Sequence, residues 1–127
     1  MDVAHEGADV NVKTRVEHFG ESASGDPVRR FVLEASNGLK AEFIEYGASL
    51  ISLQIPVNGV LRELVLGCDT LGGYEEQEVY LGALVGRCAN RIYRGHLVLP
   101  DALHRLDLNH GDHHLHGGDE GFSHKVW

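Results

Sequence analysis

The chain has 127 residues, of which 43% are hydrophobic and 24% are charged, a composition typical of one folded globular domain. Its net charge of −8 argues against nucleic acid and anionic membranes as partners, because phosphate groups need a basic surface. No apolar run approaches the length of about 18 residues that predicts a transmembrane helix. The first residues show neither the basic region nor the apolar stretch of a secretory signal. We therefore expect a cytoplasmic protein in which Cys68 and Cys88 are buried free thiols.

Glycine accounts for 16 residues, and long helical patterns are few. Many turns between short alternating segments are typical of an all-β protein with antiparallel strands. Residues 1–12 are polar and show no hydrophobic period, which predicts a flexible N-terminal lead-in. Residues 13–127 are expected to form one β unit, since no linker, repeat or charge block divides them.

Two Asn-Gly pairs predict two β-hairpins in the first half of the chain. Asn and Gly accept the positive φ that tight hairpin turns require. The turns and their flanking alternating segments are Asn37-Gly38 between residues 28–35 and 39–46, and Asn58-Gly59 between residues 48–55 and 60–66. Pro56 has no N–H group and is expected to end the strand that precedes the second turn.

The second half is predicted to contain more irregular structure. Residues 69–82 are expected to cross the surface, with a short helical turn capped by Asp69 or Thr70. Residues 95–107 alternate around Pro100-Asp101, which predicts a third hairpin. Residues 109–121 are polar and rich in glycine and histidine, so a loop is expected there.

Three sets of acidic residues are candidates for acid–base chemistry. They are Glu42, Glu45 and the run Glu75-Glu76-Gln77-Glu78. A two-carboxylate hydrolase needs its two acids about 5–10 Å apart, and no sequence pattern pairs these residues. They are interpreted as a solvated face.

Histidines gather in the second half, where seven of the nine lie between His96 and His124. His114 and His116 flank one residue, so on an extended chain both rings would point the same way. With Glu120 as an oxygen ligand, the pair would suit iron, manganese or zinc. This spacing resembles the first metal motif of cupins, although Leu108 stands where that motif has glycine. An exposed histidine-rich loop without a function is the alternative.

A second candidate stretch covers residues 85–92 and contains Asn90 next to Arg91. A carboxamide beside a planar guanidinium offers several hydrogen-bonding groups for sugar hydroxyls or a carboxylate. The alternative interpretation is that the arginines here form ordinary surface salt bridges.

Taken in order, these segments resemble the aldose 1-epimerases, also called galactose mutarotases. The resemblance runs from about residue 38 to residue 127. It is carried by Tyr46-Gly47-Ala48, residues 64–71 (Leu-Val-Leu-Gly-Cys-Asp-Thr-Leu), Tyr74, residues 86–92 (Gly-Arg-Cys-Ala-Asn-Arg-Ile), Asn109, Leu115-His116-Gly117-Gly118, Gly121-Phe122 and Trp127. The most specific part is the pair of Ala-Asn-Arg-Ile and Leu-His-Gly-Gly.

This resemblance implies a large antiparallel β-sandwich that interconverts the α and β anomers of a hexose such as galactose or glucose. It implies no cofactor and no metal. In the family, a glutamate removes the proton of the C1 hydroxyl while a histidine protonates the ring oxygen, so the ring opens and closes on its other face. His116 matches the first of two active-site histidines and is assigned a catalytic and a substrate-binding role. Arg91 matches the active-site arginine and Asn90 the sugar-binding asparagine before it.

The second histidine, a sugar-binding aspartate and the general-base glutamate of the family are expected beyond Trp127. The sequence therefore predicts the N-terminal strands of a mutarotase-like supersandwich, which hold half of a sugar pocket and are inactive alone. One alternative is a non-catalytic carbohydrate-binding relic that uses Asn90, Arg91 and His116. A cupin-like metal-binding protein is the other alternative.

Overall fold

The computed structural model describes residues 11–127, so the predicted lead-in lies almost entirely outside the described residues. The elements in chain order are β1 (Val12–Glu21), β2 (Pro27–Ala35), β3 (Lys40–Ile44), β4 (Ser49–Val57), β5 (Val60–Glu63), α1 (Leu71–Glu76), β6 (Arg91–Ile92), the 3₁₀ turn η1 (Tyr93–Gly95), β7 (His96–Val98), β8 (Leu103–Arg105), β9 (His114–Leu115) and the 3₁₀ turn η2 (Phe122–His124). Within this described part, no helix has the length and apolarity needed to cross a bilayer.

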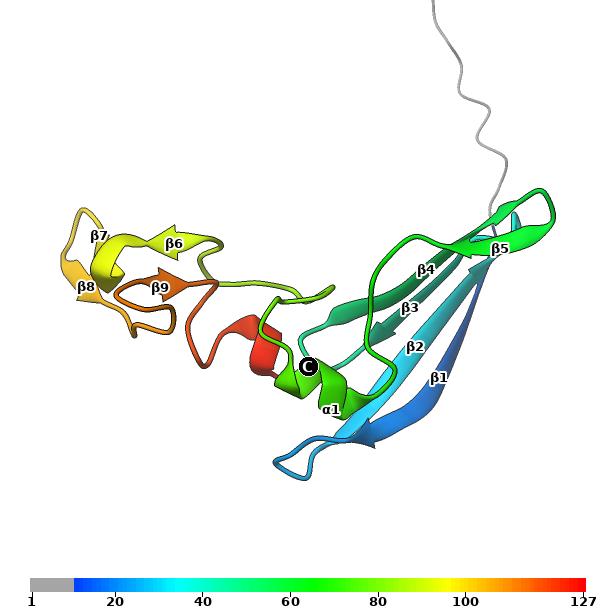
Figure 1. Cartoon of the computed structure of the whole chain (residues 1–127), viewed down its shortest axis with the longest axis horizontal. Coiled ribbons are helices and arrows are strands. Elements are labelled where there is room, and N and C mark those ends of the chain that lie inside the picture. The colour runs from blue at the N-terminus through cyan, green and yellow to red at the C-terminus, as the bar shows by residue number, and fades with distance from the viewer. Residues whose placement is uncertain (1–10) are drawn as a thin grey trace, which may run out of the picture.

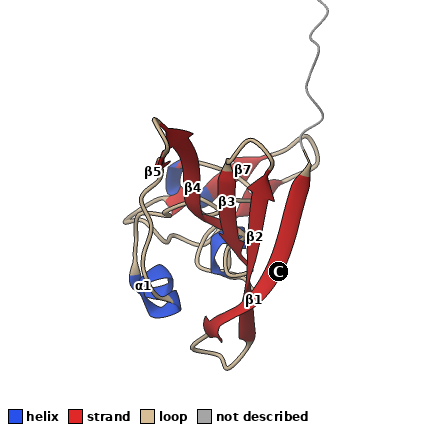
Figure 2. Ribbon diagram, turned by 90° about the vertical axis from the view of Figure 1, so that its right-hand side faces the viewer, coloured by secondary structure: helices blue, strands red, loops and turns tan. Residues whose placement is uncertain are grey.

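Strands β1 to β5 form one antiparallel sheet in chain order and stand side by side in Figure 2. Residues 86–127 form a second region, called the lobe here, with two small antiparallel sheets, β6–β9 and β7–β8. Figure 1 shows β6 to β9 at one end of the molecule and the large sheet at the other, with α1 and η2 between them. The predicted all-β antiparallel architecture is confirmed.

All three predicted hairpins are present, as β2–β3, β4–β5 and β7–β8. Asn58 and Gly59 have φ of 51° and 78°, the left-handed values that their turn requires. The prediction that Pro56 ends its strand is wrong, because β4 continues to Val57 and Pro56 pairs with Leu61 of β5. Strand β3 pairs with β4 only as far as Gln54, so the missing N–H of Pro56 interrupts no ladder on that side.

Strand β1 was not predicted. It pairs with β2 along most of its length, from Val12 opposite Ala35 to Glu21 opposite Pro27. Val12, Thr14 and Val16 alternate with charged residues, which is the pattern of a strand with one apolar face. The signal was therefore present in the sequence, but no strand was predicted before residue 28.

The two faces of the large sheet differ in chemistry. Register places Val16 opposite Phe31 and Phe31 opposite Phe43, so these apolar side chains share one face. Phe43 remains 36% exposed on that face and Val16 52% exposed. The opposite face carries a ladder of ion pairs in which Arg30 contacts both Glu17 and Glu42.

The interpretation of Glu42 and Glu45 as solvated is wrong, since they are only 8% and 7% exposed. Glu42 accepts from Arg30 at 3.3 Å and pairs with Lys40 at 2.6 Å. Glu45 accepts from the backbone N–H of Arg29 at 2.9 Å and from its Nε at 2.8 Å. The hydrogen bond from the Arg29 side chain lowers the pKa of Glu45. Burial of these carboxylates is possible because each one is paired with a cation.

The core lies where α1 packs against one end of the sheet. Val28 of β2 and Ile44 of β3 are fully buried against Leu71 and Tyr74 of α1. Thr70 caps the helix as predicted, and its Oγ1 accepts from the N–H of Gly73 at 3.2 Å. Residues 69–82 thus cross the surface as predicted, and two of their side chains, Leu71 and Tyr74, are buried in the core.

The two cysteines are free, as predicted, but half-buried rather than fully buried. Cys68 lies at the edge of the core, where its backbone N–H donates to the hydroxyl of Tyr74 at 2.9 Å.

Candidate functional site

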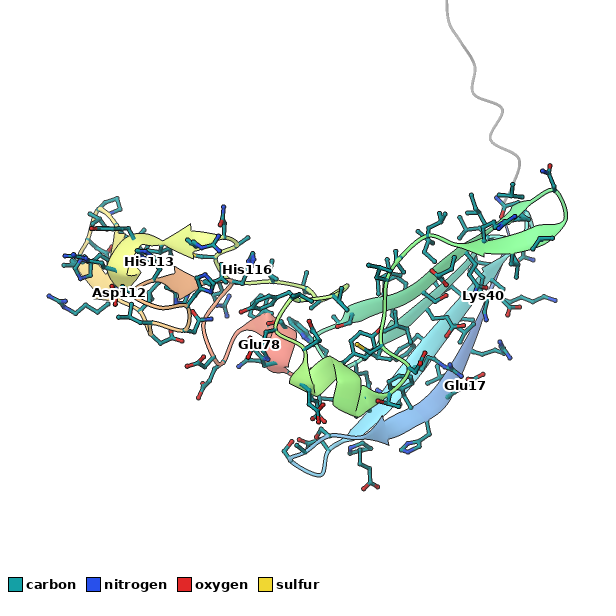
Figure 3. The ribbon with its side chains drawn as sticks, viewed as in Figure 1. Glu17, Lys40, Glu78, Asp112, His113 and His116 are labelled. Atoms are coloured by element: carbon teal, nitrogen blue, oxygen red, sulfur yellow. The ribbon has the colours of Figure 1, made fainter. Side chains whose placement is uncertain are left out.

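The β6–β9 sheet brings the two specific motifs of the sequence into contact. Arg91 of β6 pairs with Leu115 of β9, so Asn90 lies beside His116. The N–H of Asn90 donates to Nδ1 of His116 at 3.0 Å, and the N–H of His116 donates to the carbonyl of Asn90 at 3.2 Å. In Figure 3, His116 lies on the side of the lobe that faces α1, whereas Asp112 and His113 lie at its far end. The structure thus brings all three predicted site residues together.

The backbone at this contact is unusual. Asn90 and His116 have φ of 60° and 53°, and Gly117 and Gly118 continue with 100° and 82°. Asparagine tolerates the left-handed region, and glycine has no Cβ to clash there. A Cβ on Gly117 would lie 1.7 Å from the carbonyl oxygen of Gly86, and one on Gly118 would lie 2.0 Å from Asp107 Oδ2. Both positions after His116 therefore require glycine, because neighbouring atoms occupy the space that a Cβ would need.

Hydrogen bonding fixes how the His116 ring is protonated. The backbone N–H of Asn90 can only donate, so Nδ1 of His116 must be the acceptor. In the neutral ring the proton is then on Nε2, which becomes a hydrogen-bond donor. The edge of the Tyr80 ring packs against this imidazole, with ring centroids 4.8 Å apart. His116 is half-buried, so it presents a donor of fixed orientation at the surface.

Arg91 lies next to this histidine with its guanidinium exposed. It approaches the carboxamide oxygen of Asn90 at 3.4 Å and donates to Nε2 of His110 at 3.2 Å. Over residues 11–127, the ion pairs of arginine all lie in the large sheet, and Arg91 has no carboxylate partner. Several of its N–H groups remain available for a ligand.

His114 is oriented differently from His116, although one residue separates them. It is 3% exposed, and its Nδ1 lies 3.0 Å from the carbonyl oxygen of Asp107 and 3.3 Å from the Asp107 carboxylate. A carbonyl only accepts, so Nδ1 of His114 carries the proton. The N–H of Asp119 also donates to Asp107 and, with His114, lowers the pKa of that carboxyl. The two histidines are therefore opposite tautomers.

This difference bears on the predicted metal motif. The chain is extended at His114 in β9 but turns into the left-handed region at His116, so the two rings do not share a side. In the part of the chain that the structure describes, no three His, Cys, Asp or Glu side chains gather closely enough to hold a metal ion.

A cavity of about 430 Å³ lies beside this site, within the usual size range of small-molecule pockets. Tyr80, Asn109, His110 and His124 are among the residues that line it. A larger cavity of about 1010 Å³ contains Arg29, Glu45 and Trp127. None of the three predicted site residues lines either cavity. The smaller cavity is the better candidate, because two of its lining residues contact the site. Tyr80 packs against His116, and His110 accepts a hydrogen bond from Arg91.

Sequence reasoning assigned no role to Tyr80, Asn109 or His110. Tyr80 and His110 reach the site only through the packing of loops, and Tyr80 is 36 positions from His116 in the chain. Asn109 did carry a signal, because it is part of the motif by which the family was recognised.

A family model described as aldose 1-epimerase matches residues 29–127. The chain belongs to the aldose 1-epimerase family. It is 43% identical over 103 residues to an aldose 1-epimerase of Haemophilus influenzae and 37% identical over 111 residues to a galactose mutarotase of Bos taurus. These matches cover 81% and 86% of this chain. They cover only 30% and 32% of the two relatives, so this chain spans about a third of their length.

Solved structures agree with this assignment. The fold matches a galactose 1-epimerase from Lactobacillus acidophilus with a TM-score of 0.77 and 28% identity, over 92% of this chain and 33% of that one. An aldose epimerase homologue from C. elegans matches with a TM-score of 0.68 and 38% identity, over 72% of this chain and 29% of that one. The predicted family and fold are confirmed, for a portion of the family's length.

Proposed function

We propose that this chain supplies one wall of the hexose site of an aldose 1-epimerase, with Asn90, Arg91 and His116 as its sugar-binding residues. The observation that carries the proposal is the hydrogen bond from the Asn90 N–H to Nδ1 of His116. It leaves Nε2–H as the outward donor, which is the group needed at a sugar ring oxygen. The exposed Arg91 guanidinium and the Asn90 carboxamide suit neighbouring hydroxyls.

The reaction proposed for the complete site is ring opening by acid–base catalysis. A base takes the proton of the C1 hydroxyl, the C1=O bond forms, the bond from C1 to the ring oxygen breaks, and that oxygen receives a proton. After rotation about C1–C2, the reverse steps close the ring as the other anomer. His116 is assigned the role of donor near the ring oxygen, where it orients the sugar.

We further propose that residues 11–127 do not catalyse this reaction alone. Four carboxylates line the neighbouring cavity, but none of them makes a hydrogen bond to Asn90, Arg91 or His116; they are Glu75, Glu76, Glu78 and Asp119. A base that removes a proton must lie within hydrogen-bond reach of it. The chain would then bind a hexose weakly without accelerating mutarotation, which is also the behaviour of the alternative, a non-catalytic carbohydrate-binding protein.

The test is polarimetry of α-D-galactose and α-D-glucose in a low-phosphate buffer, with the purified chain beside its His116→Ala variant. Galactose titration monitored by ¹H–¹⁵N spectra is run on the same samples. We expect no acceleration from either protein, and shifts at Asn90 and Arg91 that the His116→Ala variant loses. Acceleration by the chain alone would overturn the proposed inactivity and require a base within these residues. A folded chain without galactose shifts would overturn the proposed sugar site.

A further inference from the structure

The carboxamide of Asn109 makes two hydrogen bonds to one residue of β9. Its Oδ1 accepts from the N–H of Leu115 at 2.7 Å, and its Nδ2 donates to the carbonyl of Leu115 at 2.9 Å. Both backbone groups of Leu115 are thus satisfied by one side chain, in the way that a neighbouring strand would satisfy them. Leu115 itself is 7% exposed, so leaving these groups unpaired would be costly.

This contact lies directly before His116. Leu115 pairs with Arg91 on its other side, so β9 is held between β6 and the Asn109 side chain. The chain then turns sharply into the left-handed conformation of His116. Movement of β9 by a fraction of an ångström would change the distance between the Asn90 N–H and Nδ1 of His116.

Asn109 also reaches the second group that contacts His116. Its Nδ2 approaches the hydroxyl of Tyr80 at 3.5 Å, a long contact, and the Tyr80 ring packs edge-on against the imidazole. One carboxamide therefore contacts the backbone that carries the histidine and the aromatic ring beside it. Among the described residues, no other side chain makes hydrogen bonds to both Leu115 and Tyr80.

We propose that Asn109 is a positioning residue that holds His116 as the Nε2–H tautomer, with Nδ1 on the Asn90 N–H and Nε2–H directed to the sugar. The proposal deepens the proposed function, since it concerns the same site. Its structural part, the tautomer of His116, is measurable without any sugar. The amide is required because both a donor and an acceptor are used: an aspartate keeps only acceptors and alanine keeps neither.

The experiment uses the 127-residue chain labelled with ¹⁵N and long-range ¹H–¹⁵N spectra of the histidine rings, at about pH 8 where imidazoles are neutral. The His116→Ala spectrum assigns the His116 signals. In the unmodified chain we expect the Nε2–H pattern for His116 and the Nδ1–H pattern for His114. In Asn109→Ala and Asn109→Asp, His116 should change to the averaged pattern of a free imidazole while His114 keeps its own.

Asn37→Ala is the matched control, because Asn37 Oδ1 also accepts a backbone N–H, that of Leu39 at 3.1 Å, but in the turn between β2 and β3. It should leave both histidine patterns unchanged. Asn109→Asp is included in case Asn109→Ala does not fold, because the aspartate retains an oxygen that can accept from the N–H of Leu115. Either Asn109 variant with an unchanged His116 pattern would overturn the proposal. Loss of both histidine patterns in Asn109→Asp would also overturn it, because Asn109 would then stabilise the whole loop and not one ring.

A galactose titration completes the test. We expect the Asn109 variants to bind galactose about tenfold more weakly than the unmodified chain, because the donor at Nε2 is no longer preorganised. If the unmodified chain binds no galactose but the tautomers change as expected, the proposed function fails and the positioning role stands. If galactose binds equally to all variants, the positioning role fails and the sugar site stands.

Discussion

In the large sheet, residues 12–63, hydrogen bonds run from strand to strand and charged side chains pair across one face. In the lobe, residues 86–127, strands have only two or three residues, and side chains of Asn109, Asp107 and His116 bond to the backbone instead. Backbone pairing tolerates most substitutions on an exposed face, whereas a side chain that replaces a strand is specific to one residue type. The large sheet therefore supplies stability, and the lobe supplies the geometry of the candidate site.

The largest loss of stability is expected when a glycine of the lobe is replaced by alanine. Gly117→Ala places a Cβ 1.7 Å from a backbone oxygen at a φ of 100°, so the loop around His116 must open. We expect a loss of at least about 3 kcal/mol of local stability, measured by hydrogen exchange of the amides at residues 109–121. The control is Gly111→Ala in the same loop, where φ is 58° but no atom lies within 4 Å of the new Cβ. Gly111→Ala should lower local stability by about 1 kcal/mol. Equal losses in the two variants would show that the positive φ alone, and not the close contact, accounts for the effect.

Truncation of a buried side chain in the core should lower the stability of the large sheet and leave the lobe unchanged. Ile44 is 1% exposed, and Ile44→Ala is expected to lower the free energy of unfolding by about 3 kcal/mol. The measurement is urea denaturation, with Val60→Ala, at a 57% exposed position, as a control within about 0.5 kcal/mol. The folded fraction should retain the His116 tautomer. If Ile44→Ala and Gly117→Ala each lower the stability of the sheet and of the lobe to the same extent, the two regions unfold as one unit. The proposed division of roles between sheet and lobe would then be wrong.

A pH effect of intermediate size is expected at Glu63. The hydroxyl of Ser52 and the N–H groups of Leu53, Leu64 and Val65 lower the pKa of this carboxyl to about 2. A depressed pKa gives stability that is present above the unfolded value of about 4.5 and is lost as pH falls toward 2. Because the side chain is exposed, solvent screening limits the contribution to about 1 kcal/mol. Urea midpoints at pH 6 and pH 2.5 should therefore differ more in the unmodified chain than in Glu63→Gln, and parallel shifts would count against this assignment.

The smallest effect is expected on the charged face of the sheet. Arg15 pairs with Glu17 at 3.5 Å and with Glu34 at 3.1 Å, but its side chain is 57% exposed. Arg15→Ala should change the free energy of unfolding by no more than about 0.5 kcal/mol, and added salt should reduce even that difference. A cost near that of Ile44→Ala would mean that the ion-pair ladder, and not the core, stabilises the sheet.

The sequence predictions were accurate where a feature depends on residues close together in the chain. The hairpin turns and the Thr70 cap were predicted correctly, because they depend on residues close together in the chain. The predictions for Pro56 and Glu42 were wrong, since the first depends on where a neighbouring strand ends and the second on cations supplied by other parts of the sheet. Strand β1 was overlooked although its alternation was visible.

The candidate site was found from sequence only in part. The motifs around Asn90, Arg91 and His116 identified the family, and the structure places these residues in contact. No pattern showed that Asn109 would replace a strand beside Leu115. Side-chain roles of this kind depend on loop packing over many residues, which leaves no periodic signal.

The family, the antiparallel class and the residue types of the proposed sugar-binding wall could all be read from the amino-acid sequence, because turn chemistry and specific motifs are local properties of the chain. That His114 and His116 are opposite tautomers could be learned only from their hydrogen bonds in the folded chain. The reason is physical: an imidazole is protonated on the nitrogen that its neighbours leave as donor, and those neighbours, the Asp107 carbonyl and the Asn90 N–H, come from different loops.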